Sequence, residues 1–401
     1  MRYIVQSPIF FVFTFLCLFN LTLSFTKQLY DRTSLTSMTQ PEALILETES
    51  TPGMEKPSIL IVVAGGTIIM SDDGSGLRTN KTLLKDVLAN TYFFQQPDVP
   101  KYDIIYMDPL IDSSQAVPSD WVCVARHIVQ NYENYDGFVV VHGTDSLSYT
   151  SSALSFLLMD IRKPVVVTGS QIPLSKSYND GFSNLIGSML VAGYSNIPEV
   201  TVFFHGNLFR GNRVQKISAW DQDAFSSGSF PSLGKWGVKL TMRRSLILPT
   251  PFTEFKPSLS IADKGIIQVR LFPGIDAEFL KRCIVPGETK GVILNCYGAG
   301  NGADSDDFYE LISSLRDQIV FVDVTQTHQG YVEFDYAASH KLRDSGVLPG
   351  ADMTVEAAFA KLSWLFGQEK LAGDINLVKQ AMATPLVGEM SLPNDYWGSN
   401  E

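Results

Sequence analysis

The sequence predicts an α/β fold in two parts: a larger N-terminal domain with a mostly parallel sheet and a smaller C-terminal α/β domain, joined by a linker. Short continuous apolar runs, typical of strands buried on both faces, alternate with segments of helical periodicity. A long region without this alternation divides the chain. The 401 residues are enough for two domains.

The first predicted domain, residues 57–245, contains five apolar runs that we interpret as strands: residues 59–64, 103–107, 138–141, 164–168 and 200–204. Helical patterns lie between them, at residues 83–88, near Ser119, from Ser146 and at 184–194. Such alternation indicates βαβ units. Turn residues interrupt three strand ends, at Thr67, Ser113 and Thr144. If the strands are parallel, these hydroxyls gather at one edge of the sheet.

Residues 210–262 are less regular and rich in Ser, Gly, Pro and aromatic residues. We interpret them as a loop-rich tail of the first domain and a linker, which we assign to residues 246–264. Alternation resumes in the second domain, residues 265–401, with strands predicted at 265–271, 291–296 and 319–324. Helices are predicted at residues 277–283, 308–315, 336–342, 355–366 and 376–382.

The N-terminus resembles a secretory signal peptide. Arg2 precedes an apolar run, residues 9–25, that ends in small or polar residues. We interpret residues 1–24 as a cleaved signal, which predicts a secreted protein or one in the lumen of the secretory pathway. A retained membrane anchor is the alternative, but the run is short for a span of about 20 residues and contains Asn20. Residues 25–56 are interpreted as a flexible leader.

Composition excludes several classes of function. The net charge of −11, without Lys/Arg clusters, disfavours binding to nucleic acid or anionic membranes. The histidines and the cysteines Cys123, Cys283 and Cys296 show no metal-ligand spacing, so no metal is implied. The sequence contains no G-x-S-x-G elbow, P-loop or H-E-x-x-H motif, so the common serine hydrolases, NTPases and zinc peptidases have no support.

The stretch 137–156 places His142, Gly143, Thr144 and Asp145 between a predicted buried strand and a helix. Ligands bind at the carboxyl ends of parallel strands in open α/β folds. The alternative is a simple connection in which Asp145 or Ser146 caps the helix, and spacing alone does not decide. A threonine hydroxyl is a weak nucleophile that needs a base or a cation beside it. A lysine in a dry pocket could serve, but the residues alone do not identify which one.

A glycine motif in the second domain suggests a different chemistry. Residues 298–303 (GAGNGA) fit G-x-G-x-x-G/A between a strand and a helix, and Asp323 follows at about the spacing of a dinucleotide-binding site. That fingerprint normally occupies the first βα turn of its domain, whereas a βα unit precedes it here. We therefore favour a glycine turn that brings backbone close to a neighbouring site. An NAD(P)-binding oxidoreductase is kept as an alternative.

Four blocks closely resemble the signature blocks of L-asparaginases: residues 65–68 (GGTI), 112–114 (DSS), 142–146 (HGTDS) and 210–216 (RGNRVQK). The stretches TSSALSF, PVVVTGSQIPL, DAF, YGAGN and GADMTVEA are similar to that family too. The resemblance covers residues 57–390 in order, and the type I, bacterial-like branch is the nearest match.

This resemblance implies hydrolysis of L-asparagine to L-aspartate and ammonia without a cofactor. It implies that Thr67 attacks the side-chain amide carbon and forms an acyl-enzyme. Thr144, Asp145 and Lys216 would form a second hydroxyl–acid–base cluster, in which Asp145 also holds the substrate's α-amino group. The N–H of Thr144 is a candidate oxyanion donor.

The resemblance also implies how substrate and subunits are arranged. Ser113 would bind the α-carboxylate of the substrate, helped by Asp112 and Ser114. Asn301 falls where the family sends a polar side chain to the site of a neighbouring subunit. A homodimer or homotetramer is therefore expected.

Two departures from the family pattern leave alternatives open. Leu77 stands where the family has a tyrosine on a flexible lid after the first threonine. Some type I enzymes have a regulatory asparagine site lined by an arginine and a cysteine, and the aligned positions here are Asn295 and Thr327. A catalytically weakened homologue that acts as an amino-acid-binding protein is one alternative. A tRNA-dependent amidotransferase subunit is another, which the signal peptide and acidic composition disfavour.

Overall fold

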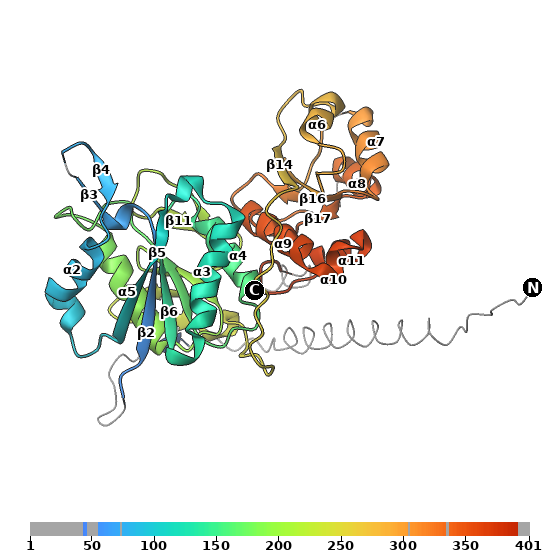
Figure 1. Ribbon diagram of the computed structural model, residues 1–401. Helices are drawn as coiled ribbons and strands as arrows, with labels where there is room; N and C mark the ends of the chain where they lie inside the picture. Colours follow the sequence, from blue (N-terminus) through green and yellow to red (C-terminus); the bar gives the residue numbers. More distant parts are fainter. Residues whose placement is uncertain (1–42, 46–54, 73, 304, 334–336, 392–401) are drawn as a thin grey trace, which may run out of the picture. The chain divides into compact units, whose positions relative to one another are not determined.

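The computed structural model describes residues 43–45, 55–72, 74–303, 305–333 and 337–391 (Figure 1). The predicted signal peptide and most of the predicted leader lie outside this part of the chain. Within it, no helix combines the length and the apolar character needed to cross a bilayer.

The larger sheet has the strand order β1-β13-β12-β9-β8-β7-β6-β2-β5. Its parallel part consists of β2 (Ser58–Gly65), β5 (Lys101–Ile111), β6 (Gly137–Val141), β7 (Val165–Thr168) and β8 (Val200–Phe204), with β5 at the edge of the sheet. Neighbouring strands are in register, with Val63 opposite Val141 and Val141 opposite Thr168. The predicted mostly parallel sheet is confirmed.

Helices cover both faces of this sheet: α2 (Leu83–Asn90), α3 (Pro118–Gln130), α4 (Leu147–Leu157) and α5 (Gly181–Tyr194). Alternate residues of β2 pack on opposite sides. Leu60 and Val62 join the cluster that contains α3 and α4, whereas Ile61 and Val63 join the cluster that contains α5. A strand buried on both faces has no polar side, which explains its continuous apolar run. Short 3-10 helices complete the domain: η1 (Thr67–Ile69), η2 (Tyr92–Gln95), η3 (Ser113–Gln115), η4 (Tyr132–Asn134) and η5 (Arg244–Leu246).

The structure differs from the sequence prediction where a loop-rich tail was expected. β9 (Asn207–Arg210), β12 (Gly234–Trp236) and β13 (Leu240–Arg243) extend the sheet in antiparallel fashion, and β10 (Gln215–Lys216) pairs with β11 (Phe225–Ser226). Buried Leu240 and Met242 alternate with exposed neighbours, but over too few residues to be recognised as a strand pattern. Part of the expected leader also differs, because Ala43–Ile45 forms β1 beside β13. A small hairpin joins β3 (Met70–Asp72) to β4 (Leu77–Thr79).

The smaller sheet is parallel throughout, in the order β14-β15-β16-β17. Its strands are β14 (Ile266–Arg270), β15 (Gly291–Cys296), β16 (Val320–Thr325) and β17 (Leu348–Pro349). Its helices are α6 (Ala277–Cys283), α7 (Asp306–Leu315), α8 (Ala337–Asp344), α9 (Val355–Gly367), α10 (Glu369–Ala372) and α11 (Ile375–Met382). The predicted smaller α/β domain is confirmed.

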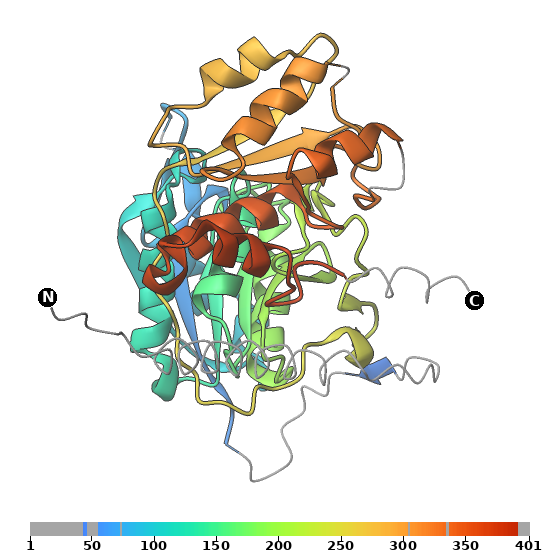
Figure 2. The ribbon, with the colours of Figure 1, turned by 90° about the vertical axis from the view of Figure 1, so that its right-hand side faces the viewer.

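Helix α9 of the second domain packs directly on α4 of the first (Figure 2). The rings of Phe156 and Trp364 stack with their centroids 6.1 Å apart, and one hydrophobic cluster includes residues of both sheets. Because α4 begins just after Asp145, this contact fixes the helix that follows the candidate site.

Candidate functional site

The strand order of the larger sheet reverses at β2 and β6. The chain passes from β2 to β5 on one side and then to β6 on the other. Ligands in open α/β sheets bind outside the carboxyl ends of the strands at such a reversal. Thr67 follows β2, Ser113 follows β5 and Thr144 follows β6. The hydroxyls expected at one sheet edge therefore do lie there.

Two glycines allow these strand ends to touch. Gly66 has a φ of +100°, and a Cβ added to it would lie 2.4 Å from the backbone nitrogen of Gly143. A Cβ added to Gly143 would lie 2.3 Å from Ser113 Oγ. Any larger residue would push the strand ends apart. The end of β6 thus meets the end of β2 at backbone contact and the side chain of Ser113, after β5, with Thr67 and Thr144 each one residue beyond its glycine.

Lys216 reaches this edge from β10. Its Nζ lies 2.8 Å from both Thr144 Oγ1 and Asp145 Oδ1. The Lys216 side chain is 20% exposed and that of Asp145 is 61% exposed, so the pair faces the solvent side of the edge. The structure therefore brings together three of the four residues that were expected to be catalytic.

Gln171 joins the same cluster, and the sequence analysis did not single it out. The ammonium group of Lys216 donates to Thr144 Oγ1, so the hydrogen of that hydroxyl points elsewhere; it is donated to Gln171 Oε1 at 3.3 Å. Gln171 Nε2 donates in turn to Asp221 O at 3.0 Å. A usable signal was present, because Gln171 comes shortly after the apolar run 164–168, in the same place relative to its strand as the other candidates.

The fourth expected catalytic residue, Thr67, begins η1 and is partly buried. Among the described residues, none makes a hydrogen bond with its Oγ1. Leu77, which replaces the expected lid tyrosine, is 46% exposed on β4 and lies opposite Asp72 in the hairpin that follows η1.

The predicted carboxylate-binding residues form a tight turn after β5. Asp112 Oδ1 accepts hydrogen bonds from the backbone nitrogen and the hydroxyl of Ser114, at 3.0 and 2.9 Å. Ser113 is buried against Gly143, and its carbonyl accepts a hydrogen bond from Ser146 Oγ at 2.6 Å. Asp112 thus shapes the turn, while Ser113 connects it to the Thr144 segment.

His142 supports the turn that carries Thr144. Because a carbonyl only accepts, His142 Nδ1 donates to Gly143 O at 2.8 Å, and Nε2 accepts from Thr150 Oγ1 at 3.1 Å. Burial lowers the pKa of the imidazole, which favours the neutral ring that these two bonds require. His142 is a buried structural histidine that connects the turn to α4.

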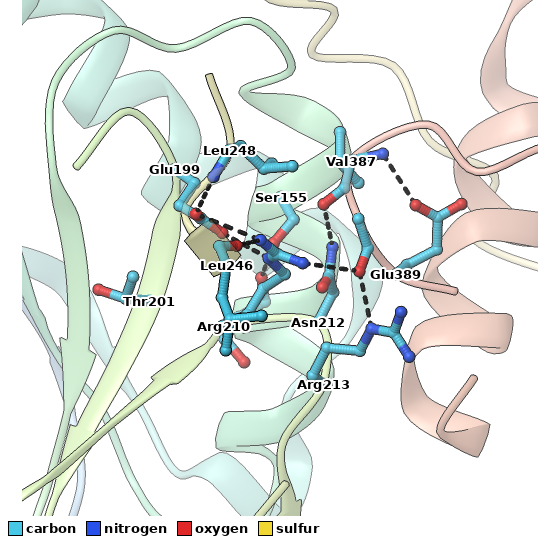
Figure 3. A network of polar contacts seen from close by, with 12 residues as sticks. Ser155, Glu199, Thr201, Arg210, Asn212, Arg213, Leu246, Leu248, Val387 and Glu389 are labelled. Carbon is cyan, nitrogen blue, oxygen red and sulfur yellow. Dashed lines mark hydrogen bonds and ion pairs between the residues drawn. The ribbon is translucent and has the colours of Figure 1, made fainter. Parts of the chain in front are cut away.

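Buried charges surround the segment that leads to Lys216 (Figure 3). Arg210 Nε lies 2.6 Å from Glu199 Oε2, and its guanidinium also donates to Leu246 O. Arg213 Nη1 lies 2.7 Å from Asp352 Oδ2. Burial lowers the pKa of Arg213, and the nearby Asp352 carboxylate opposes that shift. Both pairs have side chains at most 5% exposed.

Asn301 lies in the glycine turn after β15. Its backbone exchanges two hydrogen bonds with that of Tyr297, at 3.0 and 2.8 Å. Among the described residues, no hydrogen bond links the Asn301 side chain to the first-domain cluster. Within one chain, Asn301 and Lys216 are therefore not hydrogen-bonded to each other. The expected role of Asn301 in the site of a neighbouring subunit stays a prediction.

The carboxylate that suggested a dinucleotide site is fully buried. A Cβ on Gly300 would lie 2.7 Å from Asp323 Oδ2, so Asp323 lies directly beneath the glycine turn. Neither carboxylate oxygen accepts a hydrogen bond from the described residues, and burial raises the pKa of Asp323 to about 7. Because a ribose hydroxyl could not reach this group, the dinucleotide-binding interpretation has no support from the geometry.

A cavity of about 420 Å³ opens beside Lys216. Arg270, Asn295 and Thr327 also line it. The two positions that depart from the regulatory asparagine site of some type I enzymes therefore share one cavity with the lysine of the candidate site.

In the described parts of the chain, no three His, Cys, Asp or Glu side chains are grouped so that they could hold a metal ion. Cys123, Cys283 and Cys296 are free thiols. The polar groups at the sheet edge are thus a hydroxyl–lysine–carboxylate set, which suits acyl transfer by a hydroxyl nucleophile.

Comparisons with known proteins agree with this geometry. The family description "Asparaginase, N-terminal" matches residues 58–248, and "Glutaminase/Asparaginase C-terminal domain" matches residues 266–382. L-asparaginase 1 of Escherichia coli (strain K12) is 39% identical over 345 residues, which cover 85% of this chain and 100% of that protein.

Two further relatives are informative. The crystal structure of L-asparaginase I from Vibrio cholerae matches with a TM-score of 0.78 and 36% identity, covering 84% of this chain and 100% of that one. The 60 kDa lysophospholipase of Mus musculus is 36% identical over 357 residues, which cover 84% of this chain but 63% of that protein.

Proposed function

The chain belongs to the asparaginase family of amidohydrolases, and we propose that it hydrolyses L-asparagine to L-aspartate and ammonia as a member of the type I branch. The observation that carries this proposal is the contact of Lys216 with Thr144 and Asp145, at the sheet edge where Thr67 also lies with a hydroxyl that no described residue bonds. A hydroxyl nucleophile needs such a neighbouring relay to lose its proton.

In the proposed reaction, Thr67 Oγ1 attacks the side-chain amide carbon of asparagine and a C–O bond forms. The carbonyl oxygen becomes negative and is stabilised by the N–H of Thr144, an interaction of a kind typically worth about 3–4 kcal/mol. The C–N bond then breaks, ammonia leaves and an aspartyl ester remains on Thr67. Water attacks the ester, which releases L-aspartate and restores the threonine.

Thr144 and Lys216 are proposed to relay protons in both half-reactions. On attack, Thr67 loses one proton and the leaving nitrogen takes up one. On hydrolysis, water loses one proton and Thr67 regains one. For the relay to accept a proton, Lys216 reacts as the neutral amine: it takes the proton of the attacking hydroxyl through Thr144, returns it to the leaving group, and ends each half-reaction as it began. The two 2.8 Å contacts of Lys216 Nζ keep the relay on the substrate side of the sheet edge.

Substrate recognition is assigned to the groups around this relay. The exposed carboxylate of Asp145 would bind the α-amino group, and the turn of Asp112, Ser113 and Ser114 would bind the α-carboxylate. Fixing both ends as well as the amide penalises the extra methylene of glutamine by about 1–3 kcal/mol. Asparagine is therefore the expected substrate.

Assembly and location are part of the proposal. We infer a homodimer or homotetramer in which Asn301 acts across subunits, a small-molecule substrate and no nucleic-acid partner. The apolar run at residues 9–25 supports secretion. Sizing of the purified protein and N-terminal sequencing of the secreted product test these two points.

A catalytically weakened, amino-acid-binding homologue is the second candidate, because Leu77 replaces the lid tyrosine. The variant Leu77→Tyr distinguishes a fully active asparaginase from a catalytically weakened homologue. If Leu77 limits catalysis, this variant hydrolyses asparagine faster than the wild type; if another group replaces the tyrosine, the rate does not rise.

Ammonia release from saturating L-asparagine tests the proposed function. The wild type is expected to release ammonia, and Thr67→Ala to lose at least about 10³-fold in rate because the nucleophile is gone. Thr241→Ala, an exposed threonine on β13, is the matched control and is expected to keep full activity. A wild type that releases no ammonia would refute the proposal.

A further inference from the structure

The segment that carries Lys216 is anchored by the second domain. Arg213 and Gln215 lie on either side of the buried Val214. Arg213 Nη1 lies 2.7 Å from Asp352 Oδ2, and Gln215 Nε2 donates to Glu356 Oε2 at 3.1 Å. The next residue along the chain is Lys216. Two carboxylates of one short second-domain stretch thus hold the side chains of two residues that come just before the lysine.

A C-terminal segment, residues 386–391, closes over the same arginine. Arg213 Nε donates to Gly388 O at 2.7 Å and Arg213 Nη2 donates to Ser391 Oγ at 3.1 Å. Ser391 also donates to Asp352, from its backbone nitrogen and its hydroxyl, at 2.7 Å each. Asn212 Nδ2 donates to Val387 O at 3.0 Å (Figure 3).

The C-terminal segment is itself fixed by a buried charge. Glu389 accepts hydrogen bonds from the backbone nitrogens of Leu386 and Val387, at 3.0 and 2.8 Å. It also pairs with Lys361 at 2.6 Å, and both side chains are fully buried. The carbonyl of Gly388 is therefore presented to Arg213 by a segment with little freedom.

Such a network is better suited to fixing a geometry than to adding stability. The desolvation of buried ions offsets much of their attraction, and apolar replacements of the same volume are often as stable. A buried network of several ion pairs and hydrogen bonds does, however, favour one arrangement of its members. Here the arrangement that it fixes is that of residues 210–213, three residues before a lysine whose long side chain must hold two 2.8 Å contacts.

We propose that Arg213, held by Asp352 and by residues 386–391, is a positioning residue that keeps Lys216 against Thr144 and Asp145. The inference rests on the proposed function, because it assumes that Lys216 acts in the reaction. Arg213 acts through Lys216 and touches no reacting atom. The C-terminal segment is thereby part of the machinery of the first domain's site.

The variant Arg213→Lys tests this role while keeping a cation beside Asp352. We expect kcat for asparagine to fall about ten- to hundredfold, because small displacements of a catalytic group have effects of that size. KM is expected to change little. In a Lys216→Met background, Arg213→Lys should cause no further fall in kcat. An equal fall in both backgrounds would overturn the proposal.

A control separates positioning from simple destabilisation. Ile312→Val removes a methyl group from the second-domain core, in a cluster that contains neither Arg213 nor the C-terminal segment. It is expected to lower the melting temperature and leave kcat unchanged. If Arg213→Lys does not fold, Ser391→Ala removes one contact of the arginine and is expected to lower kcat in the same non-additive way.

A second readout does not depend on activity. Acetic anhydride in limiting amount acetylates lysines in proportion to their reactivity. Peptide mass spectrometry then measures the extent of acetylation of Lys216 relative to that of the exposed Lys256. We expect Lys216 to react faster in Arg213→Lys than in the wild type, because its contacts are loosened. Unchanged labelling would contradict the proposal. If the wild type releases no ammonia, the proposed function fails, and this labelling still decides the role of Arg213.

Discussion

Two glycine turns follow buried parallel strands in this chain, one in each domain, and they place their carboxylates differently. At the end of β6 in the first domain, Asp145 is exposed and paired with Lys216 at 2.8 Å. In the second domain, Asp323 of β16 lies under the turn after β15, fully buried and without a hydrogen bond from the described residues. Both turns looked like sites in the sequence.

This difference shows that a strand followed by a glycine turn predicts where a site can lie, but not which reaction its residues can perform. The chemistry of the first turn depends on a cation that arrives from a distant part of the chain, since Lys216 is 72 residues from Thr144. Among the described residues, no cation pairs with Asp323. A strand followed by a glycine-containing turn thus leads to a lysine–carboxylate cluster in one domain and to a buried acid in the other.

Removing the cation should have the largest effect. Lys216→Met is expected to lower kcat for asparagine by about 10²- to 10⁴-fold, because the proton relay is lost. The melting temperature should change little, since a partly exposed ion pair contributes about 1 kcal/mol or less. Ammonia release and thermal unfolding measure the two effects. Lys341→Met is the matched control, because Lys341 makes an ion pair of the same 2.8 Å length with Asp306 in the second domain. An equal loss of activity in Lys341→Met would contradict the role of Lys216 in the proton relay.

Neutralising the buried acid should do the opposite, raising stability and leaving activity intact. Burial raises the pKa of Asp323 from 3.8 to about 7, so the folded state keeps a proton that the unfolded state releases between these values. Stability therefore falls as pH rises from about 4 to 7, by an upper limit of about 4 kcal/mol, and stays low above pH 7.

The variant Asp323→Asn carries no charge at any pH. It should gain most of that stability at pH 8 and almost none at pH 4. Urea unfolding at the two pH values measures the gain. An equal change at both would show that ionisation of Asp323 is not what limits stability.

The turn after β2, which meets the β6 turn, and the second-domain turn offer a matched pair of glycines. Gly66 and Gly300 both have a φ of +100°, so alanine is strained at either position. At Gly66 the new Cβ meets the backbone of Gly143 at 2.4 Å, whereas at Gly300 it meets side-chain atoms of Asp323 and Val332 at 2.7 Å.

Side chains can move more easily than paired strands. Gly66→Ala should therefore cost about 3 kcal/mol or more, and Gly300→Ala about 1–2 kcal/mol. Denaturant unfolding compares them. Equal costs would mean that the close approach of β2 and β6 is not essential to the site.

Much of the fold could be predicted because its strands are buried on both faces and appear as continuous apolar runs. The strand at residues 291–296 and the helix at 277–283 have the predicted bounds. The gathering of Thr67 and Thr144 at one edge followed from the parallel order alone. The same strand-end rule, applied to the run at 164–168, would also have identified Gln171.

Other features had no local signal. The contact of Lys216 depends on chain folding over 72 residues, so only the family resemblance pointed to it. Arg213 meets Gly388, 175 residues away, and no periodicity connects them. The short strands β12 and β13 were missed because three or four residues show too little alternation to stand out from a loop.

The central claim is that Thr67 is the nucleophile, and its most direct test is to locate the residue that carries the acyl group of the intermediate. The full chain is mixed with L-asparagine, quenched in acid within a turnover and digested for peptide mass spectrometry. The result that we predict is an aspartyl ester on the peptide that contains Thr67, absent when Thr67→Ala is used. An ester on Thr144, or undiminished ammonia release by Thr67→Ala, would contradict it.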